Sequence, residues 1–215
     1  MSKPGSPQRP GSLRIIGGRW RGRRIVLPPH ADIRPTPDRV RETLFNWLAP
    51  VIDGMRCLDL FAGSGALGLE ALSRGASESW FVENSKASAA QLSDTLRELE
   101  CRSAKVVTGD ALRFLQQQQG HFDLVFLDPP FDGIDLGNLC TLLEAGWLAP
   151  VAYIYVEMSR KNLLPAMPAT WSTVREKTAG QVRFALAKRT LTTRDSPDGP
   201  GESAGETQLS KDRGG

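Results

Sequence analysis

The 215-residue sequence is poor in the residues that most often hold metals or form disulfide frameworks, with only three cysteines and two histidines. Cys57, Cys101 and Cys140 are far apart and form no CxxC pair, which argues against both a disulfide framework and a zinc site. Neither histidine has a partner constellation, so a histidine-centred catalytic site is not indicated. We therefore expect reduced, structural cysteines and no metal.

Long apolar runs are also missing. No stretch approaches the ~20 residues of a membrane-spanning helix, because Arg, Asp, Glu or Gly interrupts each one. The first residues are rich in Pro, Gly and Ser and lack the apolar region of a signal peptide. These features predict a soluble, cytoplasmic protein with no membrane partner. Nothing in the sequence indicates an obligate dimer, so a monomer is expected.

The charge is unevenly distributed along the chain. Residues 1–41 hold ten basic and two acidic residues, a net charge of +8, whereas the remaining chain has 17 basic and 22 acidic residues, a net charge of −5. Such asymmetry suggests an anionic partner for the basic part. A merely solvated basic arm remains an alternative.

Composition divides the chain into four parts. Residues 1–12 and 191–215 are polar, rich in Gly, Pro and Ser, and are predicted to be disordered tails. Residues 13–33 are predicted to form a basic β-hairpin extension, and residues 34–190 the main domain. At roughly 100–200 residues per domain, one main domain is what this length allows.

The hairpin mixes arginines with an aromatic ring, and its candidate binding residues are Arg14, Arg19, Trp20, Arg21, Arg23 and Arg24. The guanidinium group presents paired donors to phosphate oxygens, and an aromatic ring can stack on an unpaired base. The segment is therefore a candidate nucleic-acid-binding element. The alternative for Trp20, that it packs against the main domain, stays open.

A helix is predicted within residues 34–49. Thr36 is its candidate N-cap, Pro37 takes the first helical position and Asp38 lies in the first turn. Apolar residues then share one face, at Val40, Leu44, Trp47 and Leu48. This helix should pack on the core and hold the preceding Arg34-Pro35-Thr36 in place.

From residue 56 onward, short apolar runs alternate with amphipathic stretches. Strands are expected at 56–61, 79–83, 104–108, 122–127 and 152–157, and helices at 66–74, 86–100, 111–118 and 136–146. A terminal antiparallel pair is expected at 172–177 and 181–189. The pattern is typical of a Rossmann-like, doubly wound α/β sheet, in which ligands bind beyond the carboxyl ends of the strands.

The first of these strands ends in a glycine-rich loop. Gly63, Gly65 and Gly68 match GxGxxG, whose glycines let the backbone turn sharply and let a ligand approach closely. Glu83 ends the next strand 20 residues after Gly63, where an acid binds ribose hydroxyls. These features fit the binding of NAD or of S-adenosylmethionine, and a purely structural turn is a further alternative.

Two more strand ends deliver carboxylates. Asp110 could accept a hydrogen bond from an adenine amino group, cap the helix that follows, or do both. Asp128 is followed by Pro129, Pro130 and Phe131. The prolines stiffen the turn and remove two backbone donors, which leaves a row of acceptors suited to an exocyclic amine, while Phe131 offers a face for a base. A structural acidic strand end before a rigid turn is the alternative.

The chain resembles the class I S-adenosylmethionine-dependent methyltransferases that modify exocyclic amines. More closely, it is similar to the bacterial RsmD family, the 16S ribosomal RNA guanine-N2 methyltransferases. The segments that carry this resemblance are RIIGGRWRGRRI, RPTPDRVRETLFNWL, LDLFAGSGALGLEALSRGA, FVE, GDAL and DPPF, and with the terminal REKTAGQVRFAL it covers about residues 14–187. The glycine loop and DPPF are typical of amino-methyltransferases generally, whereas RPT-DRVRETLFNWL points to this family.

The resemblance implies the reaction and the roles of individual residues. A methyl group would pass from S-adenosylmethionine to the N2 amine of guanine 966 of 16S rRNA, on the small ribosomal subunit. Asp128 and the Pro129 carbonyl, in the turn with Pro130, would grip the amine, and Phe131 would pack on the flipped base. The cofactor would be contacted by Arg34, Thr36, Asn46, Asp59, Ala62, Gly63, Ser64, Gly65, Glu83, Asp110 and Ala111.

Three other functions remain as alternatives. An NAD-dependent oxidoreductase would explain GxGxxG and Glu83 but neither DPPF nor the basic hairpin. A DNA or other RNA amino-methyltransferase would share the site, although DNA enzymes usually need a further domain to identify their sequence. A non-catalytic RNA-binding protein would leave the cofactor loop and the turn at Asp128 without a purpose.

Overall fold

A computed structural model describes residues 11–27, 36–117, 120–130 and 133–191. Most of the two predicted disordered tails lies outside these residues. The predicted site residues Arg34 and Phe131 also lie outside them.

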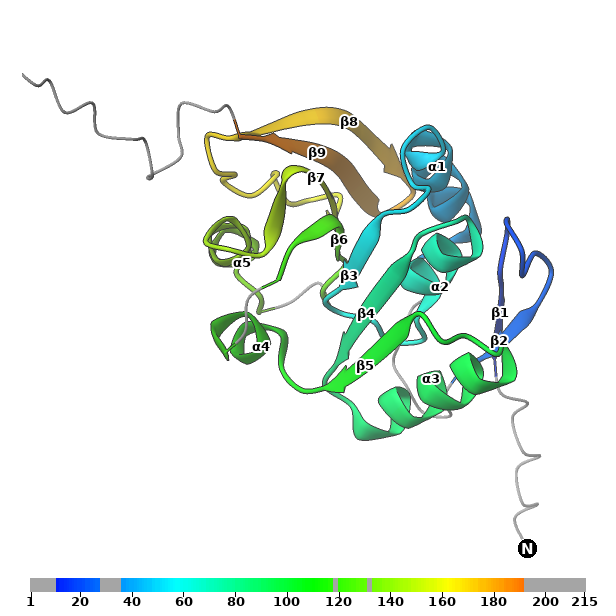
Figure 1. Cartoon of the computed structure of the whole chain (residues 1–215). Helices are drawn as coiled ribbons and strands as arrows, with labels where there is room; N and C mark the ends of the chain where they lie inside the picture. The colour runs from blue at the N-terminus through cyan, green and yellow to red at the C-terminus, as the bar shows by residue number, and fades with distance from the viewer. Residues whose placement is uncertain (1–10, 28–35, 118–119, 131–132, 192–215) are drawn as a thin grey trace, which may run out of the picture.

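A seven-stranded sheet runs through the middle of the molecule, in the order β5-β4-β3-β6-β7-β9-β8 (Figure 1). The first five of these run parallel, and β9 lies antiparallel between β7 and β8. The prediction of a doubly wound α/β sheet with a terminal antiparallel pair is therefore confirmed. The strands are β3 (Arg56–Asp59), β4 (Glu78–Glu83), β5 (Ala104–Thr108), β6 (Phe122–Leu127), β7 (Leu148–Ser159), β8 (Trp171–Ala179) and β9 (Val182–Thr190).

Helices cover both faces of the sheet (Figure 1). α4 (Ala111–Gln117) and α5 (Leu136–Glu144) pack on one face, in a core cluster that includes Phe114, Leu139 and Trp147. α1 (Asp38–Leu48), α2 (Ala66–Ser73) and α3 (Lys86–Glu98) cover the other face. None of the described helices is long and apolar enough to cross a membrane.

The basic segment forms the expected hairpin from β1 (Ser12–Arg14) and β2 (Arg24–Val26). Leu13, Ile15 and Ile25 are its buried side chains, and they join a core cluster with residues of α2 and α3. The hairpin therefore packs against the main domain. In each of its two short strands, the middle residue is buried and the residues on either side are exposed.

Strand β7 is longer than the predicted 152–157. Pro150 lies in its first part, and a proline argues against a strand because it cannot donate to the ladder. The ladder between β6 and β7 shifts register there, between the pairs Phe122–Leu148 and Leu124–Tyr153. This irregularity accommodates the proline, so the strand begins at Leu148.

The predicted cap of α1 is wrong. The N-cap position is Pro37, which makes no side-chain hydrogen bond, and the helix begins at Asp38. Thr36 instead donates its hydroxyl to the Asp128 carboxylate, with Thr36 Oγ1 2.8 Å from Asp128 Oδ2. A buried carboxylate without a donor costs more than an uncapped helix end, and this explains the different partner.

Gly68 lets α2 lie close against β4. A Cβ atom placed there would come within 2.3 Å of the Phe81 ring and 2.8 Å of Ser79 Oγ. Both neighbours are buried, so neither the ring nor the strand can move away at low cost.

We therefore expect Gly68→Ala to lower the free energy of unfolding by about 1–3 kcal/mol, because the added methyl overpacks the space between helix and strand. Gly109→Ala is the matched control, since a Cβ atom at Gly109 meets nothing within 4 Å. The control should change stability by about 0.5 kcal/mol or less. Urea denaturation measures both, and equal losses in the two variants would contradict the role of close packing.

Candidate functional site

A cavity of about 700 Å³ opens beyond the carboxyl ends of the parallel strands. This volume is typical of pockets for small organic ligands. The β8–β9 turn, at Ala179–Val182, forms part of its wall. Of the predicted site residues, those that line it are Thr36, Asp59, Ala62, Gly63, Ser64, Glu83, Asp110, Ala111, Asp128, Pro129 and Pro130.

Two predicted cofactor residues do not line the cavity. Gly65 is the N-cap residue of α2, where it adopts a left-handed backbone with φ of +79°. Asn46 is exposed on α1. A direct contact of either residue with a ligand stays a prediction.

Glu83 holds the glycine loop at the end of β4. Its Oε2 accepts a hydrogen bond from the Gly63 amide at 2.7 Å, and its Oε1 accepts one from the Ser85 amide at 2.7 Å. Each carboxylate oxygen has two lone pairs, so both can still accept from a ligand hydroxyl. Glu83 thus fixes the loop that forms the cavity wall and also faces the cavity itself.

Asp110 caps the helix that follows β5. Its Oδ1 accepts a hydrogen bond from the Arg113 amide at 3.0 Å, so the predicted capping role is confirmed. The cap uses one carboxylate oxygen, and Asp110 also lines the cavity. Both roles proposed for this residue are therefore compatible.

Glu157 is a cavity residue that the sequence analysis missed. It lies near the end of β7. Val156 of β7 pairs with Leu127 of β6, so Glu157 and Asp128, which follow them, come at the same level of the two parallel strands. Its Oε2 accepts a hydrogen bond from the buried Tyr155 hydroxyl at 2.7 Å. The sequence did carry a signal for it. An acidic residue stands at the carboxyl end of the strand predicted at 152–157, as Glu83 and Asp128 do for the strands predicted at 79–83 and 122–127.

Besides Asp110, four carboxylates from neighbouring strands thus face one cavity, and we call Asp59, Glu83, Asp128 and Glu157 the carboxylate row. Burial raises the pKa of Asp59 to about 7 and that of Asp128 to about 6. Burial and the neighbouring Asp128 carboxylate raise the pKa of Glu157 to about 8. No lining residue within the described ranges is basic, so the cavity is suited to a positively charged ligand.

The buried carboxylates predict that stability depends on pH. Glu157 binds its proton more tightly in the folded protein than in the unfolded chain. The resulting contribution to the free energy of unfolding is fully present below about pH 4.5, and it is lost as pH rises towards about 8. Over this range, the melting temperature of Glu157→Gln should fall less with pH than that of the wild-type protein. Thermal melting at constant ionic strength measures the difference.

Glu176→Gln is the control, because Glu176 is an exposed carboxylate on the edge strand β8. All other titrating groups are common to the proteins compared. If Glu157→Gln kept the full wild-type pH dependence, Glu157 would not be the buried acid described above.

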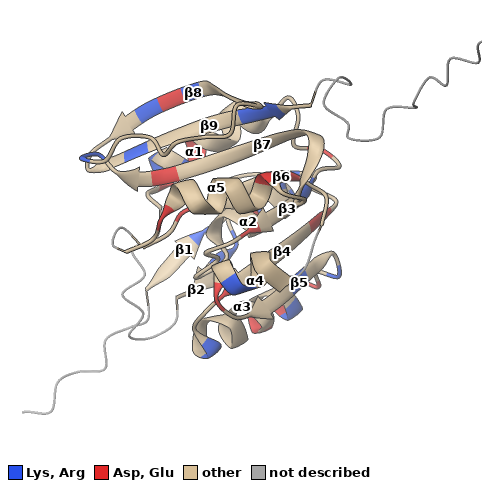
Figure 2. Ribbon diagram, turned by 90° about the vertical axis from the view of Figure 1, so that its left-hand side faces the viewer, with Lys and Arg blue, Asp and Glu red and all other residues tan. Residues whose placement is uncertain are grey.

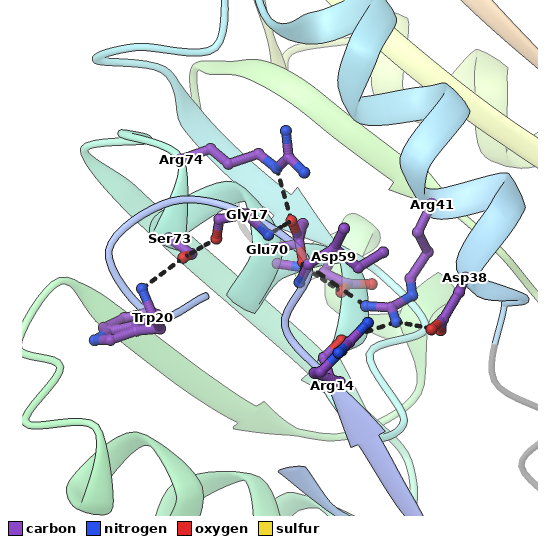
Figure 3. A network of polar contacts seen from close by, with 11 residues as sticks. Arg14, Gly17, Trp20, Asp38, Arg41, Asp59, Glu70, Ser73 and Arg74 are labelled. Carbon is purple, nitrogen blue, oxygen red and sulfur yellow. Dashed lines mark hydrogen bonds and ion pairs between the residues drawn. The ribbon is translucent and has the colours of Figure 1, made fainter. Parts of the chain in front are cut away.

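One buried carboxylate also fastens the basic hairpin to the main domain (Figure 3). Glu70 on α2 accepts hydrogen bonds from the amides of Ile16 and Gly17, each at 2.8 Å. Arg74 Nε lies 2.6 Å from Glu70 Oε1, and Arg41 NH1 lies 3.8 Å from Glu70 Oε2. The hairpin is therefore held by the same helix that the glycine loop leads into.

Trp20 packs on the domain, as one of its two interpretations predicted. Its side chain is half-buried against the cluster formed by the hairpin, α2 and α3, and its amide donates to Ser73 Oγ at 3.0 Å. The Arg19 guanidinium lies 4.1 Å from the centre of its ring. The exposed candidates of the hairpin are Arg14, Arg19, Arg21, Arg23 and Arg24.

The described residues contain no group of three or more His, Cys, Asp or Glu side chains arranged to hold a metal ion. All three cysteines are free, and Cys57 and Cys140 are buried. They contribute to the core and not to the cavity.

Comparisons with known proteins show the family of the chain. The family model described as "Conserved hypothetical protein 95" matches residues 13–188. The chain is 53% identical over 180 residues to the protein named ribosomal RNA small subunit methyltransferase D of Escherichia coli K12, which covers 83% of this chain and 91% of that protein. It is 47% identical over 191 residues to the protein of the same name from Haemophilus influenzae, with coverage of 86% and 98%.

A solved structure shares the fold. The Escherichia coli protein yhhF superposes with a TM-score of 0.78 at 52% sequence identity, over 84% of this chain and 99% of that one. Together with the sheet order, this likeness identifies the class I methyltransferase fold. The chain belongs to the Conserved hypothetical protein 95 family, which is the family of the RsmD methyltransferases.

Proposed function

We propose that this protein transfers a methyl group from S-adenosylmethionine to the exocyclic N2 amine of a guanine in 16S rRNA, at the family's target guanine 966, on the small ribosomal subunit. The observation that carries the proposal is the half-buried Asp128, which stands on a rigid double-proline turn and faces the cavity. The name that these relatives share, ribosomal RNA small subunit methyltransferase D, supports the substrate class.

The cavity fits this cofactor in size and in charge. Glu83 would accept from the ribose hydroxyls, and Asp110 with Ala111 would border the adenine. The glycine loop, at Gly63 and Ser64, leaves backbone atoms at the cavity wall for the methionine part. When bound, S-adenosylmethionine supplies an electrophilic methyl group on a positively charged sulfur, and the carboxylate row would favour that charge.

Asp128 would act as the acceptor that orients the amine. Thr36 occupies one lone pair of Oδ2, so the other oxygen remains to accept from an amine proton. Pro129 and Pro130 have no backbone donor, and the Pro129 carbonyl would accept the second amine proton. Two accepted protons favour a pyramidal nitrogen whose lone pair points away from both acceptors, toward the methyl group.

A strong base is not required for this reaction. The lone pair of the guanine amine is delocalised into the ring, so orientation at about 3–3.5 Å from the methyl carbon supplies much of the acceleration. The methylated nitrogen then loses a proton readily. Burial raises the pKa of Asp128, but the hydrogen bond from Thr36 and the positive charge of a bound cofactor would both favour the ionised carboxylate, which accepts the amine protons.

The basic hairpin would bind the RNA backbone. Its exposed arginines stand on an arm that Glu70 fixes to the domain, so they hold a set position relative to the cavity. Phosphate contacts release counterions, and RNA affinity should therefore fall steeply as salt increases.

We expect Asp128→Asn to lower the rate of methyl transfer to RNA about a hundredfold or more, because the amide presents one acceptor oxygen where the carboxylate has two. RNA affinity should stay within about twofold of wild type, since phosphate contacts supply most of it. Transfer of a radiolabelled methyl group and filter binding measure the two quantities.

Asp94→Asn is the matched control, because Asp94 is exposed on α3 and lies outside the cavity wall. It should transfer methyl groups at the wild-type rate. An equal loss of RNA affinity and methyl transfer in Asp128→Asn would contradict the role given to Asp128, and no transfer by the wild-type protein would contradict the proposed function.

A further inference from the structure

A second basic surface lies at the end of the sheet away from the helices on which the hairpin packs. Its residues are exposed and come from the loop after β7 and from the edge strand β8, and we call them the distal basic surface: Arg160, Lys161, Arg175 and Lys177. These residues lie far along the chain from the basic first 41 residues, and the sequence alone indicated no role for them.

The loop after β7 is attached to the turn that walls the cavity. The Arg160 amide donates to the Gln181 carbonyl at 2.8 Å, and Gln181 lines the cavity together with Gly180. The end of β8 leads directly into the same turn, so Lys177 stands two residues before the cavity-lining Ala179. The distal basic surface is therefore continuous with the cavity wall.

Its positive charge is not neutralised locally. Residues 159–163 and 171–183 contain one exposed acidic residue, Glu176. Its carboxylate lies 3.7 Å from Nε of Arg183, which is not part of the distal basic surface. The four side chains of the distal basic surface are thus available to an anionic partner. Figure 2 shows basic residues where β8 and β9 meet, on the same side of the molecule as hairpin β1–β2.

The arrangement matches the path of a nucleic-acid strand. A nucleotide whose base enters the cavity is followed and preceded by phosphates, so the strand leaves the cavity mouth in two directions. The hairpin packs on α2 and α3, whereas the distal basic surface lies at the other end of the sheet, on β7 and β8. One cationic surface therefore stands ready on each side of the target nucleotide.

We propose that the distal basic surface binds RNA phosphates on the side of the target nucleotide opposite to the hairpin. The inference rests on the proposed function, because it takes the cavity to hold the target base. Exposed Arg and Lys side chains contact phosphates without selecting a base, so this surface contributes affinity and register but no sequence preference.

The test compares two double variants of the full-length protein. R160A/K161A removes two cations next to the cavity and keeps the backbone amide that bonds to Gln181. R102A/K105A removes two exposed cations at the amino-terminal edge of β5, on the side of the sheet away from the cavity. The probes are small ribosomal subunits from cells lacking this gene, and 16S rRNA free of protein, over a series of KCl concentrations.

We expect R160A/K161A to reduce the slope of log affinity against log salt by about 2, since each lost phosphate contact reduces it by about 1. The slope for R102A/K105A should equal that of the wild-type protein. The affinity for S-adenosylmethionine should not change in either variant, which shows that the cofactor site is intact. The melting temperature should not change in R160A/K161A, and it should fall only slightly in R102A/K105A, because Lys105 Nζ lies 3.7 Å from the centre of the Trp80 ring.

The proposal is overturned if R160A/K161A binds both probes as R102A/K105A does while the wild-type protein binds and methylates the subunits. That result would leave the proposed function standing. Weaker binding to subunits but not to free rRNA would also overturn it, because the partner would then be a ribosomal protein. Failure of the wild-type protein to bind or methylate either probe would contradict the proposed function itself.

Discussion

The burial of acidic side chains at the ends of parallel strands is the constraint on which the site depends. Parallel strands β3, β4, β6 and β7 end at one edge of the sheet, and each delivers a carboxylate to the same cavity. Asp59 and Glu157 are buried and Glu83 and Asp128 are half-buried, so each charge is costly unless the surrounding structure supplies donors. Thr36 donates to Asp128, the Gly63 and Ser85 amides to Glu83, the Gly68 amide to Asp59 and the Tyr155 hydroxyl to Glu157.

These donors join the site to the rest of the fold. Thr36 immediately precedes Pro37 and α1, so its bond to Asp128 anchors that helix at the cavity. The Gly68 amide belongs to α2, whose Glu70 in turn fastens the hairpin. A single helix thus connects the glycine loop, a buried member of the carboxylate row and the basic arm. We infer that the relative positions of cavity and hairpin are set by packing and not by a flexible link.

Local patterns in the sequence were sufficient to predict the fold and much of the site. Strand and helix alternation, the glycine loop and the double proline after Asp128 are all properties of neighbouring residues, and the structure brings their residues together as expected. The capping role of Asp110 is likewise a contact over three residues. Glu157 was missed although its signal is local, at the end of a predicted strand. The other features that escaped prediction depend on contacts between distant parts of the chain. Thr36 fits an N-cap by its local sequence, but its partner is 92 residues away. Glu70 is the one charged residue of α2, and its role depends on amides 53 and 54 residues earlier.

Nucleoside analysis of methylated small subunits tests the central claim most directly. Small ribosomal subunits from cells lacking this gene would be incubated with the wild-type protein and labelled S-adenosylmethionine, and the rRNA digested and separated by mass spectrometry. A cavity that presents Asp128 to an exocyclic amine predicts one N2-methylguanosine per subunit, at a single position. Measurable binding of S-adenosylmethionine without any transfer to subunits or to free 16S rRNA would contradict the substrate.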